Sequence, residues 1–165
     1  MSSTTGGWLT AVRDTFKTSA SLSAFRQGTT ARAYVVQALS EEYIPSLPSQ
    51  MPFALIYPSS RIYTPASMMD CTGINQATLA YGISVFDEYR GRDGGLLGNS
   101  SKIKGVCYYA DLLKTVFDRQ LLSVVHAGEG TNILLSADYG PAGLSSYSGL
   151  AQVHLTFEFF DPTGG

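Results

Sequence analysis

An alternation of apolar and polar residues near the end of the chain is the clearest pattern in the sequence. From Leu150 to Phe160 every second position is apolar, at Val153, Leu155, Phe157 and Phe159. Successive side chains of a strand point to opposite faces, so this period of two predicts a strand with one buried face. The same period from Ala77 to Tyr89 predicts a partner strand. We expect the two strands to pair at the centre of a sheet.

The best helical pattern lies between these two strands, from Ser101 to Leu122. Its apolar residues recur at the spacing of one helix face, while charged residues occupy the opposite side. This arrangement predicts a helix that covers one face of the sheet and turns its charges outward.

Two further helices are predicted before the first long strand. Apolar residues at helical spacing indicate a short amphipathic helix from about Gly6 to Ser19, within an N-terminal extension of residues 1–28. This extension is expected to dock either on its own domain or on an adjacent subunit. The spacing from Ala31 to Tyr43 favours a helix that Pro45 ends, and a strand from Ala33 to Leu39 is the alternative.

Shorter strands and long connections complete the predicted order. Strands are expected at Phe53–Tyr57 and Thr131–Asp138, and the connection from Ser59 to Asn75 is expected to hold a short strand at Arg61–Tyr63. Residues 29–165 then form a single α+β domain. Its mostly antiparallel sheet packs against helices, with one long helix between strands.

The composition narrows the classes of function. The chain has 165 residues, of which 44% are hydrophobic and only 15% are charged, and it contains ten Tyr. Such a surface fits a protein packed against neighbours, although a large Tyr-rich core fits equally well. The net charge of −2 argues against sequence-specific nucleic-acid binding. No apolar run is long enough for a membrane span, so we expect a soluble protein made in a cytosol.

No catalytic motif is present in the sequence. It has neither a P-loop nor the Gly-x-Ser-x-Gly turn of a nucleophilic serine. His126 and His154 lie far apart and lack the spacing of zinc ligands. Cys71 and Cys107 form no Cys-x-x-Cys pair, and both are expected to be reduced and structural. We expect a protein that is not an enzyme and binds no cofactor or metal ion.

Two loops are the leading candidate contact surfaces. The segments Arg90–Ser101 and Tyr139–Gly149 are longer than ordinary hairpin loops, and such length often accompanies function. In the first loop, Leu96 and Leu97 would be exposed unless a partner covers them.

The second face of the closing strand is a further candidate contact surface. It carries His154 and Phe160 among polar residues. This face is too mixed for a core and too aromatic for plain solvent, so we expect a neighbouring subunit there.

The order of elements resembles that of the tail terminator proteins of long-tailed bacteriophages, over about Ala31 to Asp161. The resemblance is carried by two predicted helix segments and three strands, namely Ala31–Tyr43, Tyr108–Leu113, Met51–Tyr57, Ala80–Asp87 and the alternating closing strand. It implies a structural virion protein of the tail or neck that forms a homohexameric ring at the head-proximal end of the tail tube. The implied partners are further copies of the chain, the tail tube protein and the head-side connector. Assembly would take place in the host cytoplasm.

The resemblance also implies roles for particular residues. It places Arg90, Arg92 and Asp93 in an inter-subunit or tube-facing loop, and Tyr139 and Tyr147 in another, although each fits a solvated loop equally well. Two alternatives remain: a head-to-tail adaptor or another neck or tail tube subunit, and, from a different class, a small ligand-binding domain or enzyme.

Overall fold

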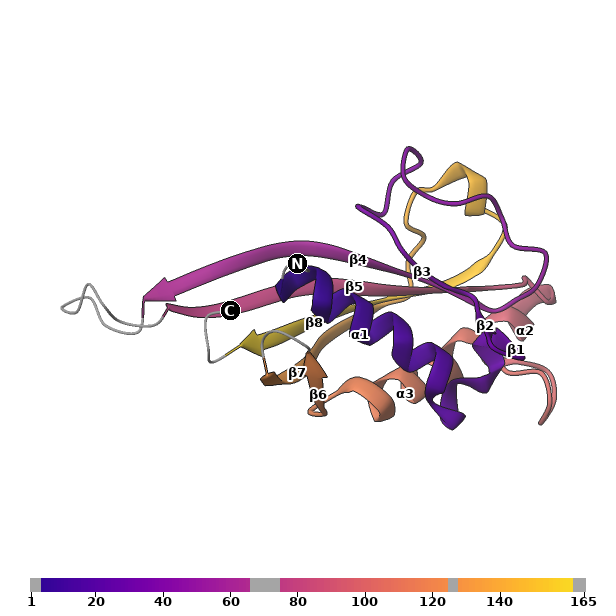
Figure 1. Ribbon diagram of the computed structural model, residues 1–165. Coiled ribbons are helices and arrows are strands. Elements are labelled where there is room, and N and C mark those ends of the chain that lie inside the picture. Colours follow the sequence, from indigo (N-terminus) through magenta and orange to yellow (C-terminus); the bar gives the residue numbers. More distant parts are fainter. Residues whose placement is uncertain (1–3, 66–74, 125–127, 162–165) are drawn as a thin grey trace.

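The computed structural model describes residues 4–65, 75–124 and 128–161, and has an α+β fold (Figure 1). The helices, 3-10 turns included, are α1 (Thr4–Thr18), η1 (Ala20–Phe25), α2 (Gly91–Leu97), α3 (Val106–Phe117) and η2 (Ser145–Tyr147). The strands are β1 (Arg26–Gln27), β2 (Thr30–Ala31), β3 (Ala33–Val35), β4 (Phe53–Pro65), β5 (Asn75–Asp87), β6 (Leu121–Val124), β7 (Gly128–Asp138) and β8 (Ala151–Asp161).

The closing strand β8 lies inside a six-stranded sheet of order β3-β4-β5-β8-β7-β6. It pairs antiparallel with β5 on one side and with β7 on the other, which confirms the predicted partnership of the two alternating strands. In register, Ile83 lies opposite Leu155 and Tyr81 opposite Phe157. Within the sheet, β3 and β4 pair parallel, whereas the other neighbouring strands pair antiparallel.

The main core lies between one face of this sheet and the helices α1 and α3. The apolar set of β8 is buried there, as its period predicted. The Trp8 ring of α1 stacks on Phe159 with 3.6 Å between ring centroids, and Phe117 of α3 meets the Phe157 ring edge to face. The predicted N-terminal helix therefore docks on its own chain. The boundary between extension and domain at residue 28 stays a prediction.

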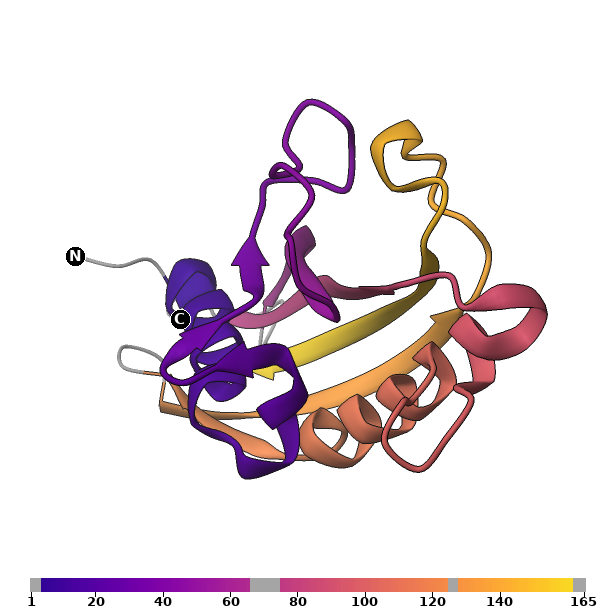
Figure 2. The same cartoon turned by 90° about the vertical axis from the view of Figure 1, so that its right-hand side faces the viewer.

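A second, smaller core covers one end of the opposite sheet face. Its buried side chains are Phe53, Leu55, Phe86, Leu144 and Tyr147. The loops of residues 36–52 and 139–150 enclose this core, and we call these two loops together the lid. Figure 2 shows the lid above the sheet and α3 beneath it. The two sheet faces therefore have different roles.

Direct hydrogen bonds hold the two lid loops together. The Glu41 carboxylate accepts hydrogen bonds from the Ser145 hydroxyl at 2.9 Å, the Ser146 hydroxyl at 2.7 Å and the Ser146 amide at 3.1 Å. The Tyr147 hydroxyl donates to the Pro45 carbonyl at 2.7 Å. The hydrogen bonds from Ser146 and Ser145 lower the pKa of Glu41, so this carboxylate is ionised at neutral pH.

The predicted helix from Ala31 to Tyr43 is wrong, and the alternative strand is correct for Ala33–Val35. Ala33 points into the main core, while Tyr34 and Val36 pack against the second core. Successive side chains of this segment therefore pack on opposite faces of the sheet. This packing favours a strand even though the apolar residues have helical spacing. The backbone amide of Val36 donates to Ile56 of β4 at 2.9 Å, which continues the pairing of β3 with β4.

The region from Arg90 to Leu122 also differs from the prediction. The loop contains the short helix α2, the long helix is shortened to α3, and Leu121 and Leu122 belong to strand β6. Gly105 precedes α3, and a glycine is favoured there because a Cβ atom would collide with the Leu96 carbonyl group. Arg119 adopts a φ of 57°, which breaks the helical path after α3.

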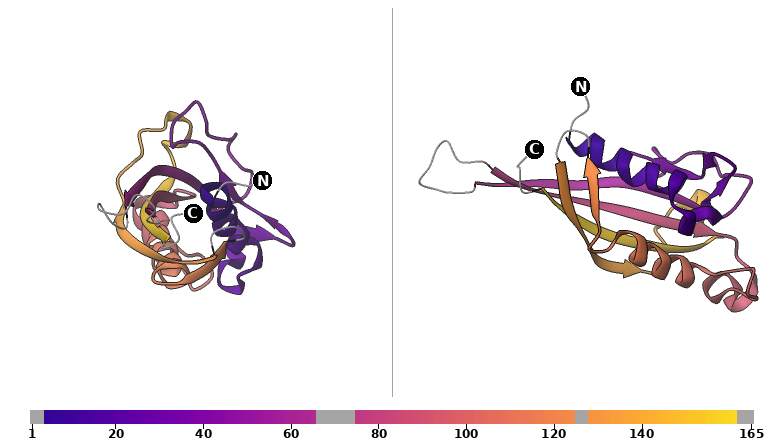
Figure 3. Two further views of the ribbon diagram at one scale, coloured as in Figure 1. Left: turned by 60° about the vertical axis from the view of Figure 1, so that its left-hand side comes forward. Right: turned by 60° about the horizontal axis from the view of Figure 1, so that its bottom comes forward.

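The strand predicted at Phe53–Tyr57 continues to Pro65, so the expected short strand at Arg61–Tyr63 is part of β4. The register shifts between Pro58 and Ser60, which accommodates the proline. Beyond this shift β4 and β5 project past the helices (Figure 3). Within the connection, residues 66–74, with Cys71, lie outside the described residues, as do residues 125–127 with His126.

We predict that Phe157→Asp prevents folding, whereas Phe160→Asp on the same strand leaves the monomer folded. Phe157 is fully buried between Tyr81 and Phe117, so the aspartate would place an unpaired charge in the main core. Phe160 is partly exposed on the other face. Circular dichroism and urea denaturation of both variants check this. A cooperative unfolding transition for Phe157→Asp near that of the wild type would contradict it.

Candidate functional site

Exposed apolar side chains gather around α2 and the start of α3, at one end of the molecule. We call this region the α2 surface; its exposed members are Tyr89, Leu96, Leu97, Ile103, Tyr108 and Tyr139. Tyr89 and Leu97 each expose more than 60% of their surface. Exposed apolar side chains of this size are typical of surfaces that contact other molecules. Leu96 and Leu97 are exposed, as the sequence predicted for the chain by itself.

The ion pair between Arg90 and Asp87 fixes α2 to the end of β5. Asp87 is fully buried, and its two carboxylate oxygens accept hydrogen bonds from Arg90 at 2.9 and 3.1 Å. Arg90 also donates to the Lys104 carbonyl at 3.3 Å, which holds the segment before α3. The hydrogen bonds to Asp87 raise the pKa of Arg90. Arg90 therefore positions the α2 surface, and its role at an interface stays a prediction.

A pocket of about 230 Å³ lies between α2 and the lid. It brings together Arg92, Leu96 and Tyr139, three of the predicted interface residues from both long loops. Burial raises the pKa of the Tyr139 hydroxyl. Asp93 is exposed on α2 but does not line this pocket. The pocket combines one cation with aromatic and aliphatic walls, which suits a protein side chain.

His154 belongs to a chain of hydrogen bonds on the lid side of the sheet. Gln152 Oε1 accepts from the Ala142 amide of the lid at 3.0 Å and lies 3.1 Å from His154 Nε2. His154 Nδ1 lies 2.7 Å from the Ser84 hydroxyl, which in turn lies 3.2 Å from the Tyr57 hydroxyl. In a neutral ring with Nε2 protonated, His154 Nε2 donates to Gln152 and His154 Nδ1 accepts from the Ser84 hydroxyl. The Ser84 oxygen can then accept from the Tyr57 hydroxyl. His154 thus connects the lid to the sheet rather than lying open to solvent.

Gly82 lies beside this chain of hydrogen bonds and leaves room for the Tyr57 ring. The Tyr57 ring lies across Gly82, where any Cβ atom would overlap it. This close approach brings the Tyr57 hydroxyl to Ser84.

Tyr147 and Phe160 lie in contrasting surroundings. Tyr147 is buried in the second core and contacts Phe53 and Phe86, so it supports the lid from inside. Phe160 lies near the projecting end of the sheet, and Ile62 and Ile133 are exposed on the same sheet face. Phe160 is therefore available for contact, whereas Tyr147 is not.

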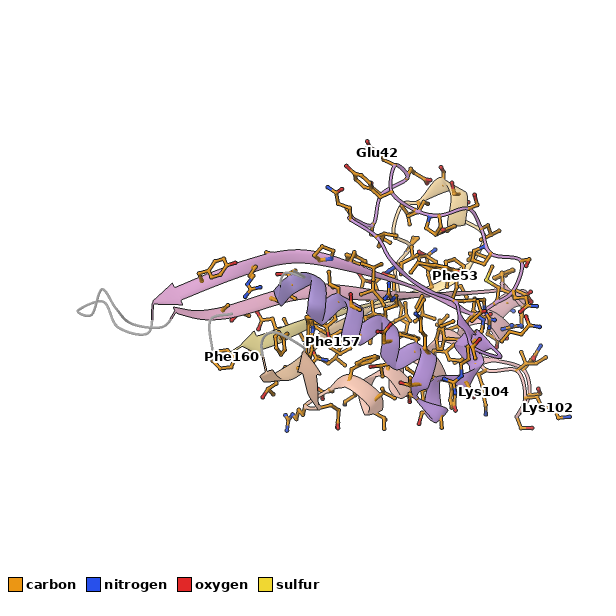
Figure 4. All side chains as sticks on the ribbon, in the orientation of Figure 1. Glu42, Phe53, Lys102, Lys104, Phe157 and Phe160 are labelled. Atoms are coloured by element: carbon orange, nitrogen blue, oxygen red, sulfur yellow. The ribbon has the colours of Figure 1, made fainter. Side chains whose placement is uncertain are left out.

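Charge is segregated between the lid and the segment that leads into α3. The lid carries Glu41 and Glu42 and no Lys or Arg, whereas residues 96–110 carry Lys102 and Lys104 and no Asp or Glu. Figure 4 shows Glu42 at the tip of the lid and both lysines at another part of the surface. The Lys104 ammonium lies 4.8 Å from the centre of the Tyr108 ring.

No contact role was predicted for Ile103 or Tyr108. Ile103 was expected within the long helix but lies before α3, and Tyr108 lies on the exposed side of α3. The pairs Glu41–Glu42 and Lys102–Lys104 are visible in the sequence, but only the fold shows that exposed apolar side chains accompany them. That combination identifies Lys102, Lys104 and Glu42 as candidates.

Three further observations concern other kinds of site. Within residues 4–65, 75–124 and 128–161, no three His, Cys, Asp or Glu side chains lie together as a metal site would need. No described helix is long and apolar enough to cross a membrane. Burial raises the pKa of the Cys107 thiol, which opposes formation of a reactive thiolate.

Comparison with known proteins gave a likeness in fold. No protein-family model and no curated protein matches the sequence. Among the solved structures that match is a chain of the "Virion of native gene transfer agent (GTA) particle". That chain is 17% identical, with a TM-score of 0.58 over 97% of this chain and 98% of that chain. The two chains thus share a fold over almost their whole lengths.

We predict that Arg90→Ala lowers the free energy of unfolding by about 3–5 kcal/mol, because it leaves the buried Asp87 carboxylate without its cation. Arg92→Ala is the matched control, since Arg92 is exposed one helix position from the start of α2. Urea denaturation measures both. Equal stability of the two variants would show that the ion pair does not hold α2.

We predict that His154 makes the protein less stable as the pH falls below 6.5. Burial lowers the pKa of His154 in the folded state, so the unfolded chain binds the proton first. As the pH is lowered from 6.5, the free energy of unfolding therefore decreases until the pH passes the folded pKa. Above pH 6.5 the contribution of His154 is fully present and no longer changes with pH. His154→Gln is expected to show a shallower decline in urea denaturation between pH 7 and 5. An unchanged slope would contradict this.

Proposed function

We propose that this protein is a structural component of a phage-like virion. The observation that carries the proposal is the likeness in fold, over almost the whole of both chains, to a chain of a gene transfer agent virion particle. Exposed apolar side chains at the α2 surface and near Phe160 support it, because an assembled subunit covers such side chains with its neighbours.

Within this class, we propose the role of a tail terminator. The chain would form a ring, a hexamer by resemblance, at the head-proximal end of the tail tube and join it to the neck. Its partners would be further copies of itself, the tail tube protein and the head-side connector. In this role the protein is not an enzyme, and it acts in the virion after assembly in the host cytoplasm.

The distribution of exposed side chains supports a ring. Subunits of a cyclic ring contact one another through two different patches, so each copy needs two separate adhesive surfaces. The α2 surface and the region around Phe160 lie at opposite ends of the sheet (Figures 1 and 4). A head-to-tail adaptor would share these features, whereas a tube subunit would polymerise into long stacks.

Light scattering and negative-stain electron microscopy of the purified chain test the proposal. We expect closed rings of one size at micromolar concentrations. Long tubes would favour the tube subunit. A stable monomer that binds a small molecule would overturn the structural role and favour a ligand-binding domain or enzyme.

We predict that Arg92→Glu leaves the monomer folded but weakens assembly, because it reverses the charge at the pocket between α2 and the lid. Lys114→Glu on the exposed side of α3 makes the same charge change away from this pocket and is the control. Circular dichroism verifies folding and light scattering measures assembly. Normal assembly of Arg92→Glu would show that this pocket is not part of the interface.

A further inference from the structure

The lid and the segment of residues 96–110 have opposite charges of equal size. The lid has a formal charge of −2 from Glu41 and Glu42, and residues 96–110 have +2 from Lys102 and Lys104. Asp93 and Asp111 flank the second segment outside these bounds. We call residues 96–110 the basic segment. The lid and the basic segment therefore attract each other electrostatically.

Apolar side chains accompany the charges on both surfaces. On the lid, Tyr43 and Leu47 are exposed on the same loop as Glu42. On the basic segment, Leu97, Ile103 and Tyr108 are exposed around the two lysines. Contact between the two surfaces would bury apolar area and pair opposite charges at its rim, which is the usual arrangement of a protein interface.

The lid has the rigidity that an interface needs. Glu41 already binds Ser145 and Ser146 of the second lid loop, and Tyr147 ties that loop to Pro45. Glu42 is exposed at the tip and is not one of the residues that make these hydrogen bonds. The basic segment is likewise fixed through the Lys104 carbonyl by Arg90. Docking would therefore cost little ordering of either surface.

We propose that the lid of one copy docks on the basic segment of the next copy. This inference rests on the proposed ring and names the surfaces that form its repeated contact. A contact between identical surfaces would place Glu42 near Glu42, or Lys102 near Lys102, and like charges repel. The head-to-tail pairing joins unlike surfaces, as a cyclic ring requires.

A pair of charge-reversed variants tests the pairing. The first variant, Glu42→Lys with Ser40→Lys, changes the formal charge of the lid from −2 to +1 and so makes it basic. The second variant, Lys102→Glu with Lys104→Glu, makes the basic segment acidic. All four positions lie outside the buried core. Circular dichroism establishes that each variant is folded, and Lys114→Glu again controls for a change of charge elsewhere.

Each variant alone is expected to need at least about tenfold more protein to assemble, because every contact then joins like charges. An equimolar mixture is expected to assemble near the wild-type concentration. In the mixture, each basic lid meets an acidic segment and each acidic lid meets a basic segment, in an alternating ring with an even number of copies. Sedimentation velocity of each variant and of the mixture measures these differences.

The outcomes separate this inference from the proposed function. If the wild type forms rings and both variants do so equally well, the surfaces named here are wrong and the ring stands. Weakened variants that the mixture fails to rescue would also overturn the pairing of these two surfaces. If the wild type remains a monomer over the whole concentration range, the ring and its named contact both fail.

Discussion

The pairing of β8 with β5 is the interaction on which the rest of the structure depends. The pairing spans the whole of β8, from Ala77 opposite Asp161 to Asp87 opposite Ala151. Their alternating residues form a single apolar face, onto which α1 and α3 pack. The intervening residues of the two strands point to the opposite face, where the same pairing brings His154 and Ser84 together beside the second core. A shift of register by one residue would exchange the two faces. Both the packing of α1 and α3 and the contact between His154 and Ser84 would then be lost.

The lid is anchored to this opposite face of the sheet. Gln152 lies on β8 and accepts from Ala142, so the second lid loop is tied to the central strand. Glu41 then ties the first loop to the second. At the end of β5, buried Asp87 holds Arg90 and through it α2. The two surfaces that we propose to meet in assembly are thus both anchored to the central strand pair.

Strong local patterns allowed the central strands to be predicted from the sequence. Where the local pattern was weaker, as from Ala31 to Tyr43, the predicted element was wrong. The period of two in β8 predicted its buried face and its partner. The segment from Ala31 to Tyr43 has helical spacing, yet Tyr34 and Val36 pack as strand residues because β4 lies alongside. That partnership is distant in sequence, so no local pattern contains it.

The candidate site shows the same division between local and distant information. The exposure of Leu96 and Leu97 followed from their place in a polar loop. The burial of Tyr147 and the role of Arg90 depend on Pro45 and Asp87, and only the fold shows which groups these side chains meet. The opposite charges of the lid and the basic segment were present in the sequence. Their significance came from the exposed apolar side chains that the fold places around them.

Hydrogen–deuterium exchange of the chain in its monomeric and assembled states would show whether the lid and the basic segment meet while the central strand pair stays unchanged. We predict slow exchange of β8 and β5 in both states, because assembly leaves the central pairing unchanged. We also predict that residues 36–52 and 96–110 become more protected on assembly. Unchanged protection of both segments in assembled particles, or a rise in protection confined to β8 and β5, would contradict these predictions.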